Sequence, residues 1–135
     1  MNYLLTLFLI SFLLILPQHQ KIHIVGRWSG EDQNEIGSII FEEDGYAAFE
    51  IQGQILGGKE FYMSGEKGKM TYSINYETTP IEVDFTLTKV ESGESKQILA
   101  ILEFENDNTL NFNLSFDGPR PSEFDDNSIV LTRSK

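Results

Sequence analysis

Two histidines and many carboxylates are the side chains of this sequence best suited to acid–base chemistry. Both histidines, His19 and His23, follow directly on an apolar N-terminal run. A histidine acts as a general base where a folded site positions it against its substrate, so a Ser–His–Asp triad has little material here. The chain also lacks the G-x-S-x-G, H-E-x-x-H and Walker patterns. We therefore predict no catalytic residue and a non-enzymatic protein.

The carboxylates do not form a recognisable acid–base pair or metal site. Glu82 and Asp84 alternate with apolar residues, which predicts the solvent face of a strand, where carboxylates keep ordinary pKa values. The acidic runs 42–44 and 125–127 do not match the calcium loop D-x-D-x-D-G. The chain has no cysteine, so thiolate metal sites and disulfides are excluded. We predict neither a metal nor a cofactor.

The charge of the chain limits its partners. It carries 21 acidic and 10 basic side chains, a net charge of −11, and all of them lie after residue 20. Nucleic acids and anionic membrane surfaces are bound by clustered Lys and Arg, so neither is an expected partner. Strong net charge keeps a protein soluble and separate, and the domain is expected to be a monomer.

The N-terminus predicts export. Residues 3–16 (YLLTLFLISFLLIL) are almost entirely apolar, and Pro17 ends the run. The run is shorter than the roughly 20 residues that span a bilayer, and polar residues follow it, as in a secretory signal peptide. We predict a signal peptide over 1–20 and one domain over 21–135, secreted or periplasmic. The alternatives are an uncleaved N-terminal anchor and a buried core helix.

After residue 20, most segments alternate with a period of two. The alternation is clearest over 70–76, 81–87 and 110–116, and an Asp-Gly turn at 44–45 separates two further runs. Strands about ten residues apart predict an all-β antiparallel fold, closed as a barrel or folded as a sandwich. We predict an up-and-down barrel of about eight strands. The segment 53–68 holds five glycines and is predicted to form turns around one short strand near 60–63.

Most of the aromatic residues share the inward phase of these strands. In a barrel of about eight strands they fill the core or line a cavity for one small apolar ligand, and the sequence leaves both alternatives open. The candidate ligand-lining residues are Phe41, Phe49, Tyr72, Tyr76, Phe85, Phe104 and Phe112.

A tryptophan near the start of the predicted domain and an arginine near its end form a recognisable pair. Gly26-Arg27-Trp28 is a G-x-W before the first strand, and Arg133 lies near the C-terminus. This pair resembles the lipocalins, in which the tryptophan closes one barrel end and a C-terminal arginine packs across it. The resemblance implies a buried Trp28 touched by an arginine, with Arg133 favoured over Arg120. A guanidinium on an indole face is a cation–π contact.

Two further motifs extend the resemblance. Pro80 and Asp84 fit a P-x-x-x-D strand, and 120–124 reads R-P-S-E-F shortly before the last strand. With the G-x-W, the ordered set resembles an uncharacterised family of lipocalin-like domains that are often exported from bacteria. The resemblance spans 26–133 and implies a calycin-like barrel.

The stretch 118–124 (GPRPSEF) is interpreted as structural. Pro119 and Pro121 cannot donate to a β-ladder, so they end the preceding strand and hold Arg120 in an extended connection. The predicted partner of Arg120 is the Trp28 ring, a carboxylate such as Asp84 or Glu123, or an external ligand. Phe124 is predicted to insert under the barrel end as a plug. The alternative is that the whole stretch contacts a ligand.

Together these patterns predict an exported β-barrel that binds a small apolar molecule. The alternative is a protein–protein interaction module, such as an inhibitor of an extracellular enzyme. A continuous apolar cavity would favour the first, and a filled barrel with an exposed apolar loop patch would favour the second.

Overall fold

A computed structural model describes residues 22–30 and 36–134. The predicted signal peptide over 1–20 lies outside these residues. Within them, no helix is long and apolar enough to cross a membrane. The described residues form the ten strands β1 (Gly26–Gly30), β2 (Ile36–Phe41), β3 (Ala47–Ile51), β4 (Gln54–Gly57), β5 (Phe61–Met63), β6 (Glu66–Asn75), β7 (Ile81–Lys89), β8 (Ser95–Asn106), β9 (Thr109–Ser115) and β10 (Ile129–Arg133).

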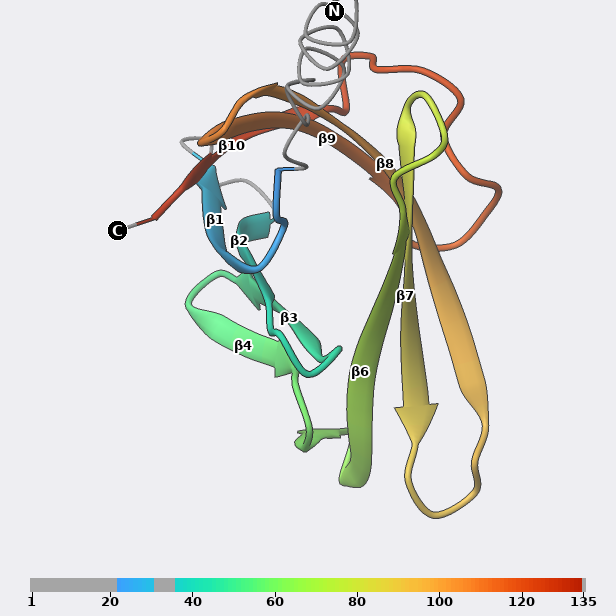
Figure 1. The fold of residues 1–135 in the computed structure, drawn as a ribbon. Helices are drawn as coiled ribbons and strands as arrows, with labels where there is room; N and C mark the ends of the chain where they lie inside the picture. Colours follow the sequence, from blue (N-terminus) through green and yellow to red (C-terminus); the bar gives the residue numbers. More distant parts are fainter. Residues whose placement is uncertain (1–21, 31–35, 135) are drawn as a thin grey trace, which may run out of the picture.

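The strands form one antiparallel meander in the order β4-β3-β2-β1-β10-β9-β8-β7-β6-β5. Pairing of β1 with β10 joins the two ends of the chain, and the sheet curls into a nearly closed barrel (Figure 1). The predicted all-β antiparallel barrel is confirmed.

The predicted count of about eight strands is too low for two reasons. The G-x-W motif lies within a strand, β1, and not before the first strand, and the glycine-rich middle forms two strands instead of one. Two-residue turns at 52–53 and 64–65 have both central residues at positive φ: Gln52 at 50° and Gly53 at 80°, then Ser64 at 53° and Gly65 at 79°. Such turns match the twist of tight hairpins. They therefore allow β4 to pair with β3 and β5 with β6.

Strand β6 makes two backbone hydrogen bonds to the other side of the barrel. Met70 N donates to Gly58 O, just after β4, at 2.9 Å, and Tyr72 N donates to Gly45 O, in the turn between β2 and β3, at 3.0 Å. Gly57 allows this approach: its φ is +123°, and a Cβ there would lie 2.5 Å from Ala47 O and 2.8 Å from Met70 Cε. A side chain at position 57 would therefore push β4 away from β3 and β6.

Two ends of the barrel matter for function. The closed end contains Trp28, Arg133 and the segment 23–25. The open end is formed by β5, the start of β6, the end of β7 and the start of β8, at the bottom of Figure 1. On β8, Phe104 contacts Trp28 at the closed end, and Lys96 lies eight residues away at the open end. At about 3.4 Å per residue, this places the two ends about 27 Å apart.

Candidate functional site

The closed end is built around Trp28, which is fully buried. The Arg133 guanidinium lies over the indole, 4.3 Å from the ring centroid. The predicted contact between Trp28 and an arginine is therefore present, and the arginine is Arg133. Register explains the pairing, because Trp28 on β1 lies opposite Arg133 on β10.

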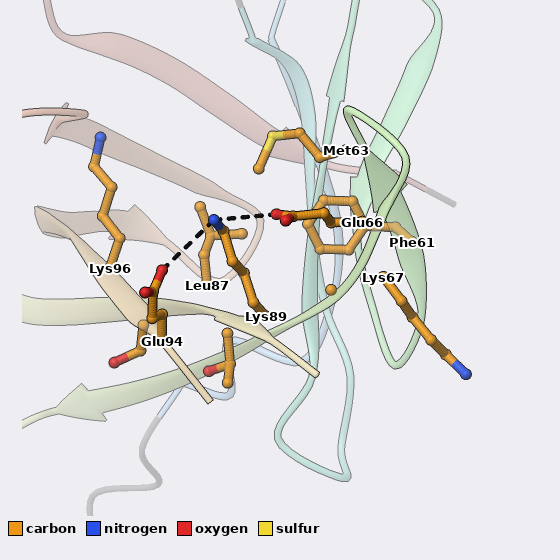
Figure 2. A pocket seen from close by; sticks show the side chains of 11 residues that line it. Phe61, Met63, Glu66, Lys67, Leu87, Lys89, Glu94 and Lys96 are labelled. Atoms are coloured by element: carbon orange, nitrogen blue, oxygen red, sulfur yellow. Dashed lines mark ion pairs between the residues drawn. The ribbon is translucent and has the colours of Figure 1, made fainter. Parts of the chain in front are cut away.

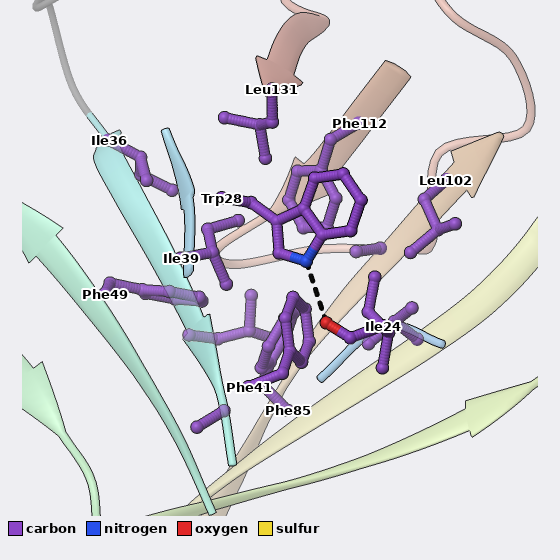
Figure 3. Close-up of a cluster of buried hydrophobic side chains, with 14 of the residues drawn as sticks. Ile24, Trp28, Ile36, Ile39, Phe41, Phe49, Phe85, Leu102, Phe112 and Leu131 are labelled. Carbon is purple, nitrogen blue, oxygen red and sulfur yellow. Dashed lines mark hydrogen bonds between the residues drawn. The ribbon is translucent and has the colours of Figure 1, made fainter. Parts of the chain in front are cut away.

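Both side chains also hold the backbone that enters the barrel. Trp28 Nε1 donates to Ile24 O at 2.7 Å (Figure 3). Arg133 donates to His23 O and Val25 O, each at 2.8 Å, and to Asp107 O at 3.1 Å. Three consecutive carbonyls of the segment 23–25 are thus bound. The Ile24 side chain is 2% exposed and belongs to the core.

Six of the seven candidate ligand-lining aromatic residues belong to the core or pack against it, and Tyr76 does not. Four of them are buried: Phe41, Phe49, Phe85 and Phe112. Their rings contact one another, with centroids 4.8 Å apart for Phe49 and Phe85 and 5.7 Å apart for Phe41 and Phe85 (Figure 3). Tyr72, Tyr76 and Phe104 are half-buried. This geometry favours the filled-core alternative over a central cavity.

Arg120 lies on the outside of the barrel, far from Trp28. Its Nη2 donates to Asp84 Oδ1 at 2.5 Å, and its Nη1 to Ala100 O at 2.9 Å and Val83 O at 3.2 Å. Val83 and Ala100 are paired across β7 and β8, so the guanidinium binds both strands. Of the partners predicted for Arg120, the carboxylate of Asp84 is correct.

The rest of the 118–124 stretch corrects one expectation. Pro121 and Phe124 are both half-buried, and Phe124 is not among the side chains packed against the core. The prediction that Phe124 plugs the barrel end is therefore wrong. Arg120 fixes this loop to Val83 and Asp84 of β7 and to Ala100 of β8.

Asn113 also anchors this loop, and this role was not predicted from the sequence. Asn113 is 4% exposed, and its Nδ2 donates to Glu123 O at 2.9 Å and to Asp125 Oδ1 at 3.4 Å. Asn113 looks like an outward-facing residue of an alternating strand, so the pattern predicted solvent. Its burial depends on the loop that covers it.

The open end holds a pocket of about 200 Å³. The inward-facing positions change character toward this end, strand by strand. Tyr72, Phe85 and Ile98 lie side by side across β6, β7 and β8. The next inward row toward this end is Met70, Leu87 and Lys96, and the row after it holds Gly68 and Lys89. The pocket is the barrel mouth where apolar inward positions give way to charged ones.

Gly68 and Phe61 shape the floor of this pocket. A Cβ on Gly68 would lie 3.1 Å from Phe61 Cε1, so the missing side chain provides the space in which the Phe61 ring lies over β6. Phe61 is 9% exposed, and Met63 at the pocket edge is 49% exposed. With Leu87 these side chains give the pocket an apolar lining.

Ion pairs surround the mouth. Lys89 Nζ lies 3.1 Å from Glu66 Oε2 and 3.6 Å from Glu94 Oε2, and Figure 2 shows it between the two carboxylates. The hydrogen bond to Glu66, followed by the charges of Glu66 and Glu94, raises the pKa of Lys89 above its ordinary value. Lys89 therefore stays charged at neutral pH. Lys96 Nζ lies 3.9 Å from Asp117, whose side chain is 93% exposed.

None of these pocket residues was predicted from the sequence as a site residue. A usable signal was present: the inward alternation of 81–87 continues to Lys89, and that of 98–104 extends back to Lys96. Charged residues in an inward phase mark the end of a filled barrel. Among the described residues, no three His, Cys, Asp or Glu side chains are grouped to hold a metal ion.

Comparison with protein-family models, curated proteins and solved structures found no match for this chain. Its geometry is therefore the basis for assigning a function.

Proposed function

We propose that this protein is a non-catalytic exported binding domain with a lipocalin-like barrel, and that its site is the open-end pocket. The pocket takes a small apolar group, while the barrel interior serves stability. The proposed site therefore lies at the open end of the barrel, whereas the inward-facing aromatic residues suggested a central cavity.

One observation carries this proposal: an apolar pocket of about 200 Å³ lies directly above a filled core. A cavity of about 150 Å³ lined by aliphatic and aromatic side chains is sufficient to hold benzene. The pocket therefore matches one aromatic ring or one branched aliphatic group. Phe61 and Leu87 offer such a group the contacts that favour removal of apolar surface from water.

Two features support a non-catalytic role. His23 is exposed, and its carbonyl is bound by Arg133 at the closed end. The charged side chains at the pocket mouth are held in ion pairs at the surface, with Lys89 between Glu66 and Glu94. A general base needs a pKa close to the working pH, and a lysine whose pKa is raised is unsuited to that task.

Export is supported by the apolar run 3–16 and by the start of the folded domain soon after it. A secreted or periplasmic protein would lose residues 1–20, and an uncleaved segment would anchor the barrel beside a membrane. N-terminal sequencing of protein from the native host tests export. An intact Met1 on protein recovered from the cytosol would contradict it.

The binding role is tested by nuclear magnetic resonance of the full-length chain titrated with benzyl alcohol. We expect amide shifts at Phe61, Leu87 and Lys96 and none at core Phe85. Met63→Ser should weaken binding by about threefold, because this pocket-edge side chain contributes apolar area. Ile55→Ser, at 59% exposure and outside the pocket, is the matched control. Shifts confined to the core, or none, would refute the pocket.

A protein–protein interaction module is the second candidate. Tyr62, Met63 and Val90 are exposed by 64%, 49% and 46% near the open end, and such side chains can anchor a partner. In that case the protein would bind and inhibit an extracellular enzyme through this surface. No small probe would bind here. Tyr62→Ala combined with Val90→Ser should then abolish co-elution with the partner, and benzyl alcohol should shift no pocket amide of the wild-type protein.

A further inference from the structure

The charges around the open-end pocket point to the class of its ligand. We infer that the pocket binds a small aromatic or branched aliphatic monocarboxylate, with the apolar group against Phe61 and Leu87 and the carboxylate at Lys96. This inference rests on the proposed function and adds the charge of the ligand to it.

The lining of the pocket is less acidic than the chain as a whole. Acidic side chains outnumber basic ones by 21 to 10 overall. The pocket lining holds three lysines (67, 89 and 96) and two glutamates (66 and 94), and the ion-pair partners Glu60 and Asp117 lie outside the lining. An anion therefore meets less repulsion here than the charge of the whole chain would impose.

The two carboxylates of the wall are already paired. Both Glu66 and Glu94 contact Lys89, at 3.1 and 3.6 Å, and a cationic ligand would have to compete with this fixed ammonium. Lys67 is 3.3 Å from Glu60, and Figure 2 shows it directed away from Lys89.

Lys96 is the cation of the wall with the weakest ion pair. Its Nζ is 3.9 Å from an Asp117 carboxylate that is almost fully exposed, a distance at which water competes effectively. Lys96 has the same inward phase as Ile98 on β8, so its aliphatic stem extends the apolar wall while its ammonium remains at the mouth. A ring in the pocket would place an attached carboxylate beside this ammonium.

The size of the pocket limits the ligand further. At about 200 Å³, it accommodates a benzene-sized group, and a longer chain would project from the mouth into solvent. Benzoate is therefore a suitable probe, with benzyl alcohol as the neutral analogue and benzylammonium as the cation.

The test is a titration of the full-length chain with these three probes, followed by amide shifts at Phe61, Leu87 and Lys96. Benzoate should bind about fivefold more tightly than benzyl alcohol, the range of an exposed ion pair. Lys96→Glu should weaken benzoate about tenfold and change benzyl alcohol less than about twofold. Lys59→Glu makes the same charge change beside Asp44, outside the pocket, and should change benzoate affinity less than about twofold.

The outcomes separate the two proposals. If benzyl alcohol or benzylammonium binds as tightly as benzoate, the charge inference fails and the apolar pocket stands. If Lys59→Glu weakens benzoate as much as Lys96→Glu, the effect is one of net charge and the inference also fails. If none of the probes shifts the pocket amides, both proposals are overturned.

Discussion

The closed and open ends use the same inward-facing positions in different ways. At the closed end, an indole and a guanidinium bind three consecutive backbone carbonyls, and Ile24 fills the remaining space. At the open end, inward-facing positions carry Glu66, Lys89 and Lys96, and the space above Phe61 and Leu87 is unfilled. The difference shows how a small barrel can keep a solid core and still hold a pocket at one end.

The closed end contributes to stability, and the open end is the site that we propose for binding. Closed-end side chains are buried and hydrogen-bonded, so their removal leaves cavities and unpaired polar groups. The charged side chains of the open end form exposed ion pairs, which contribute little to folding. Substitutions at the two ends should therefore separate unfolding free energy from ligand affinity.

The largest effect is expected for Trp28→Ala, a loss of about 3–5 kcal/mol of unfolding free energy, as for other buried aromatic residues. Urea unfolding followed by circular dichroism measures it, because the substitution removes the single tryptophan. Met63→Ala at the open end is the control and should change stability by less than about 0.5 kcal/mol. Similar losses for the two variants would abolish the distinction between the ends.

Ile24→Ala tests whether the segment before β1 belongs to the closed end. Ile24 is 2% exposed, and deleting a buried isoleucine side chain to alanine costs about 2–5 kcal/mol. Val25→Ala is a matched neighbour, since Val25 is 39% exposed, and it should cost less than about 1 kcal/mol. If the two urea midpoints agree, the segment 23–25 is not part of the folded core.

Arg120→Ala should lower stability by about 1–3 kcal/mol. Its guanidinium binds Asp84 and two carbonyls with 22% of the side chain exposed, and removing it leaves partly buried acceptors unpaired. Arg27→Ala is the control: Arg27 pairs with Glu50 but is 42% exposed, so the expected cost is below about 1 kcal/mol. Coinciding midpoints for wild type and Arg120→Ala would mean that the loop is free.

The smallest effect is a loss of stability at alkaline pH. Burial, then the charges of Tyr76 and Asp44, raises the pKa of Tyr72 on β6, and Glu66 raises that of Lys89 at the open end. The folded protein thus holds these protons to higher pH than the unfolded chain. Their contribution is complete below about pH 10 and is lost as pH rises through the folded pKa values.

Urea midpoints near pH 9 and pH 11 measure this loss, over a window set by the ordinary pKa values of about 10 and 10.4. Tyr72→Phe and Lys89→Gln should each flatten the decline between the two pH values. An equally steep decline in both variants would show that other groups cause it.

Much of the architecture was predictable because strand alternation is local. The alternation of 81–87 and 110–116 placed Phe85 and Phe112 inside, and the Asp-Gly turn at 44–45 separated β2 from β3. The strands within the glycine-rich segment were not predictable in the same way. Whether 54–57 forms a strand depends on the close approach of Gly57 to β3 and β6, which involves residues distant in sequence.

The sequence by itself determined that this chain is acidic and built of antiparallel strands with inward-facing aromatic residues, because charge, phase and residue type are properties of short segments. A contact between Trp28 and an arginine was implied only by the resemblance to the lipocalins. Tertiary structure alone decided which arginine reaches Trp28, that Arg120 binds Asp84 on the outer face, and that the core aromatic rings pack against one another. It also decided that Phe61, Leu87 and Lys96 meet at one mouth. These outcomes depend on register and closure, which bring together side chains from strands far apart in the chain.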